Sequence, residues 1–288
     1  MRLALGTVQF GMEYGVTNCS GQVGTDDVIE ILGSARDSGI DTLDTAIAYG
    51  ESEARLGEAG VTGFQVVTKL PPMPAAVEDP YAWAFRELRG SLSRLQVPSV
   101  YGLLLHRSEI LTGAHGPAIV QAMLEIKSKG LAEKIGVSIY APEELERVFK
   151  VVSVDLVQAP LNFLDRRLID SGWAAQLKDR GVELHARSPF LQGLLLMPGA
   201  ARPLQFAKWS PLWQRWDSWL KETCQTPLQA ALGFVLAQPE VDRFVFGVDG
   251  IAQLEEVLLA AQSKGVPVPD DLRSGDPELI NPSNWQRH

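Results

Sequence analysis

Short apolar runs alternate with longer stretches of helical periodicity along the whole chain. Several of these runs are continuously apolar, which is typical of parallel strands that are covered on both faces. The pattern predicts eight strands, over Leu3–Val8, Thr42–Thr45, Gln65–Lys69, Val100–Leu105, Lys134–Val137, Val154–Gln158, Val182–Ala186 and Arg243–Phe246.

Between the strands, apolar residues recur at the three- and four-residue spacing of amphipathic helices. A glycine such as Gly39 often follows such a stretch and supplies a stop signal. The spacing predicts helices over Asp26–Ser38, Tyr81–Leu95, Ala118–Lys129, Pro142–Val151, Arg167–Lys178, Leu228–Ala237 and Ile251–Ser263. Four tryptophans near helical spacing indicate a further helix packed in the core or at its rim: Trp209, Trp213, Trp216 and Trp219.

Regular alternation of strand and helix predicts parallel strands joined by right-handed crossovers. Eight such units in 288 residues fit an α/β fold, the (β/α)8 TIM barrel, for which about 250 residues are typical. A doubly wound open sheet is the alternative, but it would be expected to carry a G-x-G-x-x-G motif after the first strand, where the sequence has none. No stretch has the composition of a linker, so we expect one domain over residues 1–288, with 266–288 as a C-terminal tail or loop.

The composition is that of a soluble globular protein, with 45% hydrophobic and 21% charged residues. A net charge of −9 argues against nucleic-acid or anionic-membrane partners, although it allows a small basic site for a phosphate. Cys19 and Cys224 lack C-x-x-C spacing, which argues against a disulfide framework and for a reducing compartment. Because Gly6 and Gln9 interrupt the apolar N-terminus and no apolar stretch reaches the ~20 residues of a membrane span, we expect a cytoplasmic protein.

Four polar residues stand where a barrel brings the carboxyl ends of its strands together. Asp44 and Tyr49 follow the second predicted strand, Lys69 ends the third, and His106 ends the fourth. Barrel enzymes carry their catalytic groups at this end of the strands. The four residues are therefore candidates for a catalytic site.

Together these side chains suit the reduction of a carbonyl group by hydride. Hydride addition leaves negative charge on oxygen, so a proton donor must lie beside it, and Tyr49 is the candidate. We expect the ammonium group of Lys69 to lower the pKa of the phenol from about 10, with Asp44 holding Lys69 charged and in place. His106 can hydrogen-bond the carbonyl oxygen and orient it.

Each of the four also has a purely structural interpretation. Asp44 could cap a turn, Tyr49 could pack at the surface, Lys69 could be a solvated strand end, and His106 could be a satisfied structural histidine. Their occurrence on three successive strands of one barrel favours the catalytic interpretation.

Asp44 and Tyr49 lie within a longer motif, Asp44-Thr45-Ala46-Ile47-Ala48-Tyr49-Gly50-Glu51-Ser52-Glu53, with Leu56-Gly57 after it. This motif resembles the signature of the aldo-keto reductase family. Weaker likenesses run over nearly the whole chain, among them Val67-Thr68-Lys69, Leu104-Leu105-His106 and Lys134-Ile135-Gly136-Val137-Ser138. The resemblance implies an NAD(P)H-dependent carbonyl reductase or alcohol dehydrogenase with Tyr49 as general acid/base.

By the same resemblance, NADP or NAD would bind along the carboxyl ends of the strands. Ser138 and Gln158 would hold the nicotinamide carboxamide, and the segment after the eighth strand would hold the adenosine end. Thr7 and the loop after the seventh strand would lie along the ribose and pyrophosphate, where glycines allow close backbone approach to phosphate. The implied cofactor-binding residues are Thr7, Ser138, Gln158, Arg187, Ser188, Phe190, Gln192, Gly193, Gly247, Val248, Asp249, Gln253 and Glu256.

The chain departs from the family pattern on the nicotinamide side. Ile139 stands where the family usually has an asparagine, so one carboxamide contact is missing. Arg187 replaces an aromatic residue that stacks on the nicotinamide, and its guanidinium could stack there or pair with a cofactor phosphate. The family's N-terminal hairpin is also expected to be absent, because the first predicted strand begins at Leu3.

A second departure lies after the eighth strand. Val248 and Gln253 replace the basic residues that usually bind the 2′-phosphate, acidic Asp249 lies between them, and Val257 replaces an adenine-binding asparagine. A 2′-phosphate carries up to two negative charges and needs donors. We therefore expect a weakened preference for NADPH, with NADH as an option.

Substrate selection in such a barrel would come from the loops after the strands and from the tail. The short loop Arg107–Pro117 indicates an open pocket for a small aldehyde, ketone or sugar carbonyl. The acidic composition argues against a highly anionic substrate unless Arg107, Arg166, Arg167 or Arg187 supplies a local counter-charge. Candidate pocket walls are Phe10, Tyr14, Phe163, Phe190 and Trp209.

Two other functions stay open on the sequence alone. An NAD-dependent sugar 1-dehydrogenase would use the same four residues in the oxidative direction. A cofactor-binding regulatory barrel with little turnover is compatible with the altered cofactor positions. A metal site is not expected, because the four histidines, His106, His115, His185 and His288, form no H-x-H pair. Nothing in the sequence indicates an oligomeric state.

Overall fold

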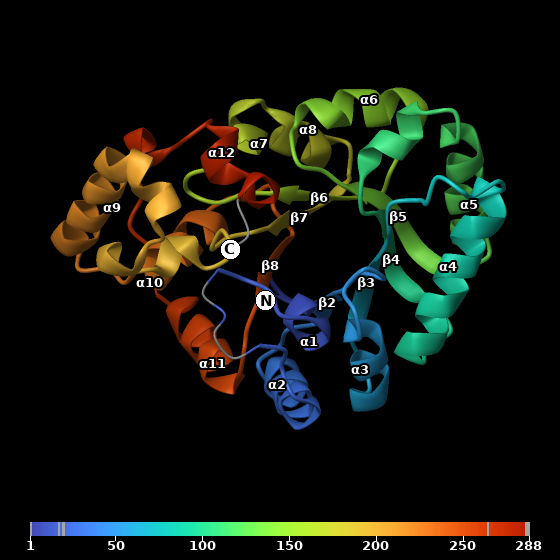
Figure 1. The fold of residues 1–288 in the computed structure, drawn as a ribbon, viewed down its shortest axis with the longest axis horizontal. Coiled ribbons are helices and arrows are strands. Elements are labelled where there is room, and N and C mark those ends of the chain that lie inside the picture. The colour runs from blue at the N-terminus through green and yellow to red at the C-terminus, as the bar shows by residue number, and fades with distance from the viewer. Residues whose placement is uncertain (1, 17, 19–20, 264, 286–288) are drawn as a thin grey trace.

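The structure, a computed structural model, describes residues 2–16, 18, 21–263 and 265–285. Eight parallel strands form a closed barrel in which neighbours follow chain order, and β1 pairs with β8 to close it (Figure 1). All eight predicted strands are confirmed, with ends that differ by one or two residues at most. They are β1 Leu3–Gly6, β2 Thr42–Asp44, β3 Gln65–Leu70, β4 Val100–Leu105, β5 Ala132–Ser138, β6 Leu156–Pro160, β7 Glu183–Arg187 and β8 Arg243–Gly247.

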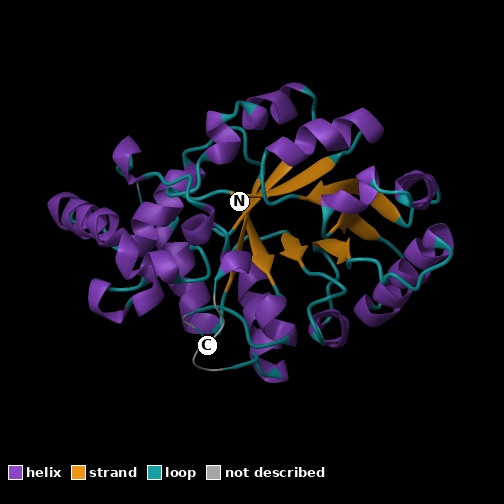
Figure 2. Cartoon of the chain, turned by 45° about the horizontal axis from the view of Figure 1, so that its top comes forward, coloured by secondary structure: helices purple, strands orange, loops and turns teal. Residues whose placement is uncertain are grey.

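Helices surround the strands, as an α/β barrel requires (Figure 2). The helix predicted over Arg167–Lys178 is instead two short helices, because Gly172 between them has a φ of +76°, which a right-handed helix does not accommodate. The helices are α1 Val8–Gly11, α2 Thr25–Asp37, α3 Ser52–Ala59, α4 Pro80–Leu95, α5 Gly116–Ser128, α6 Glu143–Val151, α7 Arg167–Asp170, α8 Trp173–Asp179, α9 Ser210–Thr223, α10 Pro227–Leu236, α11 Ile251–Ala260 and α12 Pro277–Ile280.

Three of these helices were not predicted: α1, α3 and α12, the last within the segment expected as a tail or loop. The first predicted strand was taken too far, because the chain turns into α1 after Thr7. The short α3 buries Ser52 and Glu53 as well as Leu56 and Gly57, so its inner face lacks an apolar stripe. The tryptophan-rich helix was predicted and is α9, in which Trp213 and Trp216 are buried.

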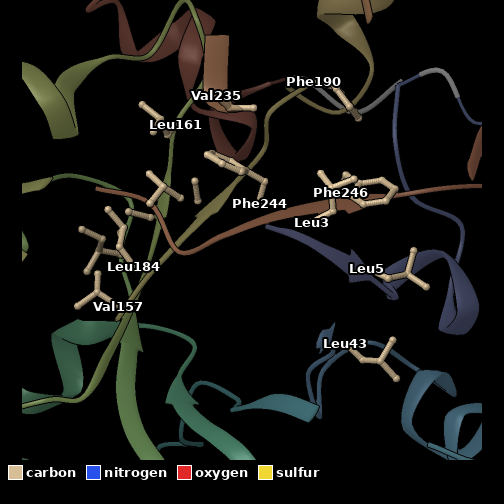
Figure 3. Packing of buried hydrophobic residues seen from close by; sticks show 14 of the residues in the cluster. Leu3, Leu5, Leu43, Val157, Leu161, Leu184, Phe190, Val235, Phe244 and Phe246 are labelled. Carbon is tan, nitrogen blue, oxygen red and sulfur yellow. The ribbon is translucent and has the colours of Figure 1, made fainter. Parts of the chain in front are cut away.

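The large hydrophobic core lies between the barrel and the surrounding helices. Leu3 and Leu5 of β1 belong to it, together with Phe244 and Phe246 of β8 (Figure 3). Full burial of one such side chain stabilises the fold by about 1.5–3 kcal/mol. A second, separate cluster consists of Val67, Leu104 and Leu156, with Tyr101 packed against it. Because side chains alternate along a strand, this second cluster lies on the other side of the sheet, inside the barrel.

The C-terminal tail is tied to the barrel by Arg166. Its guanidinium pairs with Asp270 at 2.7 Å and donates to the carbonyl oxygens of Val268 and Pro269. These contacts hold the segment Val268–Asp270 of the tail against the barrel.

In the described part of the chain, β1 is the first element, and no helix combines the length and apolarity needed to cross a membrane. Cys224 is a free, exposed thiol, whereas Cys19 and His288 lie outside the described residues.

Candidate active site

Three polar side chains lie in the barrel interior, next to the apolar cluster inside the barrel. Lys69, His106 and Gln158 each follow a member of the Val67, Leu104 and Leu156 cluster by two residues. Since side chains two apart on a strand share a face, all three point to the barrel interior, one layer nearer to the carboxyl ends of the strands. The alternation of side chains along the strands thus places a polar layer next to an apolar one.

Lys69 and Asp44 form a buried ion pair at the centre of this layer. The Lys69 Nζ lies 2.9 and 2.8 Å from the two carboxylate oxygens of Asp44 and 2.8 Å from the carbonyl oxygen of Thr45. These contacts use all three N–H donors of the ammonium group. Gln158 adds a hydrogen bond of 2.6 Å from its Nε2 to the Asp44 Oδ1, a contact that sequence reasoning did not find.

Tyr49 lies beside this pair, but its environment differs from the prediction. The Lys69 Nζ lies 5.1 Å from the centroid of the Tyr49 ring, so the cation contacts the face of the ring. Burial, and secondly the Asp44 carboxylate, raise the pKa of the phenol, and Arg187 opposes them. The expectation that Lys69 lowers this pKa was wrong, because the ammonium directs its donors to Asp44 and Thr45.

His106 joins Asp44, Tyr49 and Lys69, and these four residues are called the candidate reaction centre. Its ring meets that of Tyr49 edge to face, with centroids 5.7 Å apart and an interplanar angle of 81°. Burial, followed by the charges of Lys69, Arg187 and Arg107, lowers the pKa of His106 from 6.5 to about 3. The imidazole is therefore neutral near pH 7 and can donate one N–H to an oxygen atom.

A cleft of about 450 Å³ runs from this centre across the carboxyl ends of the strands. Apart from Lys69, which is buried behind Asp44, every residue proposed for the site borders it: Asp44, Tyr49, His106, Thr7, Ser138, Gln158, Arg187, Ser188, Phe190, Gln192, Gly193, Gly247, Val248, Asp249, Gln253 and Glu256. The structure thus brings together residues from β1 to α11, although this placement does not assign their roles.

Several residues of the cleft were missed. Gln9 comes from α1, Tyr140 follows β5, and Pro282 and Ser283 come from the tail. None of them belongs to a motif. Only the termination of β1 at Gly6 could have indicated that Gln9 turns toward the cleft.

Two of the predicted pocket walls, Tyr14 and Phe190, border the cleft. The other three do not. Phe10 and Phe163 are fully buried in the core, where Phe163 stacks on Trp216, and Trp209 donates a hydrogen bond to Asp276. Aromatic residues near strand ends are as useful for packing as for binding, which sequence alone does not distinguish.

The loop after β7 has an unusual backbone. Ser188, Leu191 and Gln192 have φ values of +60°, +48° and +55°, and Gly193 continues the left-handed conformation at +89°. Non-glycine residues rarely adopt this conformation, and when they do they concentrate at functional sites. The loop contacts the segment after β1 through Val16 N, which donates to the Gln192 carbonyl oxygen at 3.1 Å, so the two loops meet beside the cleft.

The cleft fits a nicotinamide dinucleotide by its donors and acceptors. Gln9 Oε1 is buried and has no hydrogen-bond partner among the described residues. The ten-residue helix α11 begins beside the cleft without a side-chain cap, so its first N–H groups are available to an anion. The absent Cβ of Gly247, by contrast, makes room for Gln9, since a Cβ there would lie 2.5 Å from its amide.

The end of the cleft that follows β8 is acidic. Asp249 accepts a hydrogen bond of 3.4 Å from the Gln253 side chain, and Glu256 lies nearby on α11. Within the described part of the chain, two cationic side chains border the cleft, Arg107 after β4 and Arg187 at the end of β7. No group of three or more potential metal ligands occurs among the described residues.

Comparison with known proteins matches this architecture. The profile of the Aldo/keto reductase family matches residues 2–265. The chain is 24% identical over 260 residues to the uncharacterized oxidoreductase YqkF of Bacillus subtilis strain 168, covering 82% of both chains. It is 28% identical over 195 residues to the 6-dehydroglucose reductase of Novosphingobium aromaticivorans, covering 61% of this chain and 63% of that protein.

Among solved structures, the holo form of the aldo-keto reductase AKR11C1 from Bacillus halodurans superposes with a TM-score of 0.74 at 20% identity. The superposition covers 99% of this chain and 95% of that one. At this identity the likeness establishes the fold of the barrel.

Proposed function

The chain belongs to the aldo/keto reductase family, and we propose that it reduces the carbonyl group of a small aldehyde, ketone or sugar with Tyr49 as general acid. Membership of the family implies NAD(P)H-dependent carbonyl oxidoreduction. The observation that carries the finer proposal is the buried Lys69–Asp44 pair lying against the ring of Tyr49, with the ring of His106 edge to face against the same phenol at the cleft.

Four side chains have separate tasks in this proposal. When bound, the nicotinamide cofactor supplies a hydride. Tyr49, kept protonated by burial, donates a proton to the substrate oxygen as negative charge develops there. His106, neutral near pH 7, donates a hydrogen bond that orients the same oxygen. Lys69 and Asp44, fixed by their ion pair, hold the ring of Tyr49 in place.

The same residues would serve the reverse reaction, in which the Tyr49 phenolate takes the proton of an alcohol. Burial together with Asp44 favours the protonated phenol, the form of Tyr49 that begins the reduction. A sugar carbonyl is among the candidates because one relative is named a 6-dehydroglucose reductase. The intact reaction centre supports catalysis rather than a purely regulatory barrel.

We also propose that NADH is used in preference to NADPH. A 2′-phosphate placed near Asp249 and Glu256 would meet negative charge. The guanidinium groups of Arg107 and Arg187 lie instead against the ring of Tyr140, which follows β5. Ser138, Gln158 and the loop Ser188–Gly193 would hold the nicotinamide and pyrophosphate parts. Pro282 and Ser283 of the tail border the same cleft, which supports residues 1–288 as one functional domain.

The catalytic proposal is tested by following cofactor oxidation with a panel of aldehydes, ketones and sugars for the wild type and for Tyr49→Phe. Loss of the phenolic proton is expected to lower kcat by about 10²–10⁴-fold while cofactor binding stays unchanged. Wild-type turnover in Tyr49→Phe would overturn the role of Tyr49.

The cofactor proposal has its own readout in the quenching of tryptophan fluorescence. NADH is expected to bind at least about tenfold more tightly than NADPH, a difference of about 1.4 kcal/mol. Asp249→Ser is expected to tighten NADPH binding and leave NADH binding nearly unchanged. Tighter binding of NADPH than of NADH by the wild type would contradict this proposal.

A further inference from the structure

Two arginines converge on one tyrosine at the cleft. The Cζ of Arg107, which follows β4, lies 4.2 Å from the ring centroid of Tyr140, which follows β5. The Cζ of Arg187, at the end of β7, lies 4.4 Å from the same centroid. Tyr140 thus positions two guanidinium groups from different strands, and all three residues border the cleft.

Neither arginine has a carboxylate partner among the described residues. Arg187 donates to the carbonyl oxygen of Ile139 at 3.0 Å and to the Ser188 hydroxyl at 3.3 Å, which uses two of its five N–H donors. Arg107 is exposed. In a protein with a net charge of −9, two adjacent cations without anionic partners indicate that their partner comes from outside the chain.

The two other arginines considered for a counter-charge are already engaged. Arg166 pairs with Asp270, and Arg167 pairs with Asp165 at 2.8 Å. The carboxylate nearest the reaction centre, Asp44, is paired with Lys69. Arg107 and Arg187 are therefore the cations that remain available along the described cleft.

Both arginines act electrostatically on the reaction centre. The positive charge of Arg187 opposes the rise in the pKa of Tyr49, and it contributes with Arg107 to the low pKa of His106. An anionic group held by these arginines would thus lie close to a carbonyl placed at Tyr49 and His106. It would also neutralise two charges that nothing in the described cleft balances.

We propose that the substrate is a carbonyl compound bearing an oxyanion, a carboxylate or a phosphate, which Arg107 and Arg187 bind while Tyr140 holds them in position. The inference rests on the function proposed above. The guanidinium group suits this role because its planar fork donates two parallel hydrogen bonds to a carboxylate or phosphate. Arg187 also adjoins the loop proposed to hold the cofactor, so Arg107 provides the cleaner test.

The experiment compares matched substrates that differ in the anionic group. The carboxylate arm pairs 4-oxobutanoate with butanal, and the phosphate arm pairs glyceraldehyde 3-phosphate with glyceraldehyde. Each is assayed with NADH and NADPH for the wild type, Arg107→Met, Arg107→Lys and the control Arg86→Met. Arg86 lies on α4 with a side chain that is 67% exposed, so its replacement removes the same charge far from the cleft.

In at least one arm, wild-type kcat/KM is expected to be more than about tenfold higher for the anionic substrate. Arg107→Met should lower that value by about 30-fold, or about 2 kcal/mol, mainly through KM. Arg107→Lys should lower kcat/KM for the anionic substrate less than Arg107→Met does. For the neutral substrates, kcat/KM should change by less than about twofold in every variant. The arm that shows the effect identifies the oxyanion.

Equal or better turnover of the neutral substrates by the wild type would overturn this inference and leave the proposed reductase function standing. An equal effect of Arg107→Met on anionic and neutral substrates would do the same. If none of the four substrates is reduced with either cofactor, the proposed function fails and the inference fails with it.

Discussion

Breaking the buried ion pair at the centre of the barrel should destabilise the protein more than removing both charges. Lys69 and Asp44 are 1% and 4% exposed. Asp44→Asn leaves the ammonium group of Lys69 without its counter-ion, and Lys69→Met leaves a buried carboxylate. Removing one member of such a pair costs about 3–5 kcal/mol, because the remaining charge keeps its desolvation penalty and loses its partner.

The double variant Asp44→Asn/Lys69→Met should lose less unfolding free energy than either single variant. It contains no buried charge, and its remaining penalty comes from the carbonyl oxygen of Thr45, which loses its hydrogen-bond donor. An unsatisfied buried group of this kind costs about 1–3 kcal/mol. Gln158 can keep a hydrogen bond to the new amide oxygen. The double variant is therefore expected to be more stable than either single variant by about 1–3 kcal/mol.

Urea unfolding, followed by far-UV circular dichroism, measures the free energy of unfolding of the wild type, the two single variants and the double variant. Thermal unfolding provides a second measure, in which each single variant should lower Tm by about 6–20 °C, since 1 kcal/mol corresponds to about 2–4 °C in chains of this size. If both single variants lose less than about 1 kcal/mol of unfolding free energy, the reasoning is refuted. A double variant whose loss equals the sum of the single losses would also refute it, because the two charges would then act independently.

Three further outcomes follow from named contacts. Gly11→Ala should destabilise by about 1–3 kcal/mol and lower kcat. A Cβ at Gly11 would lie 1.7 Å from the carbonyl oxygen of Tyr49, so wild-type kcat with unchanged urea midpoint would contradict this contact. Folding lowers the pKa of His106 from 6.5 to about 3. The neutral imidazole therefore contributes fully to the free energy of unfolding above pH 6.5, and this contribution is lost as the pH falls toward 3. Between about pH 7 and pH 5 the wild type should therefore lose about 1–2 kcal/mol more than His106→Gln in urea titrations, and equal losses would count against a buried neutral imidazole. Reductive kcat/KM should stay flat from about pH 6 to about pH 9, because burial raises the pKa of Tyr49, whereas a decline centred below about pH 9 would show a lowered pKa.

The fold followed from the sequence because its dominant signals are local and repeated. Several of the parallel strands are apolar runs, such as Val100–Leu105, whose predicted bounds are those of β4. The short helix α3 escaped prediction because it turns Ser52 and Glu53 inward, where Glu53 accepts hydrogen bonds from Thr68 and Ser91. Such a polar interface resembles a solvated loop when only the order of residue types is known.

The members of the candidate site were also predictable, because barrel topology brings the ends of all strands to one face. Residues that reach the cleft from outside the strand ends were not. Tyr140 and Ser283 border it through the paths of a loop and of the tail, which no periodicity records. Arg187 could be named as an unusual residue, but its contact with Tyr140 depends on packing between β5 and β7.

The charge state of the reaction centre shows where reasoning from residue types stops. A lysine beside a tyrosine suggests a lowered phenol pKa, and this holds when the ammonium faces the hydroxyl group. Here the donors of Lys69 reach Asp44 and Thr45, and the cation meets the ring of Tyr49 on its face. A difference of a few ångströms in the position of one nitrogen atom thus leaves burial as the dominant influence on the phenol. Burial thereby favours the protonated phenol, which is the form of Tyr49 that the proposed reduction requires.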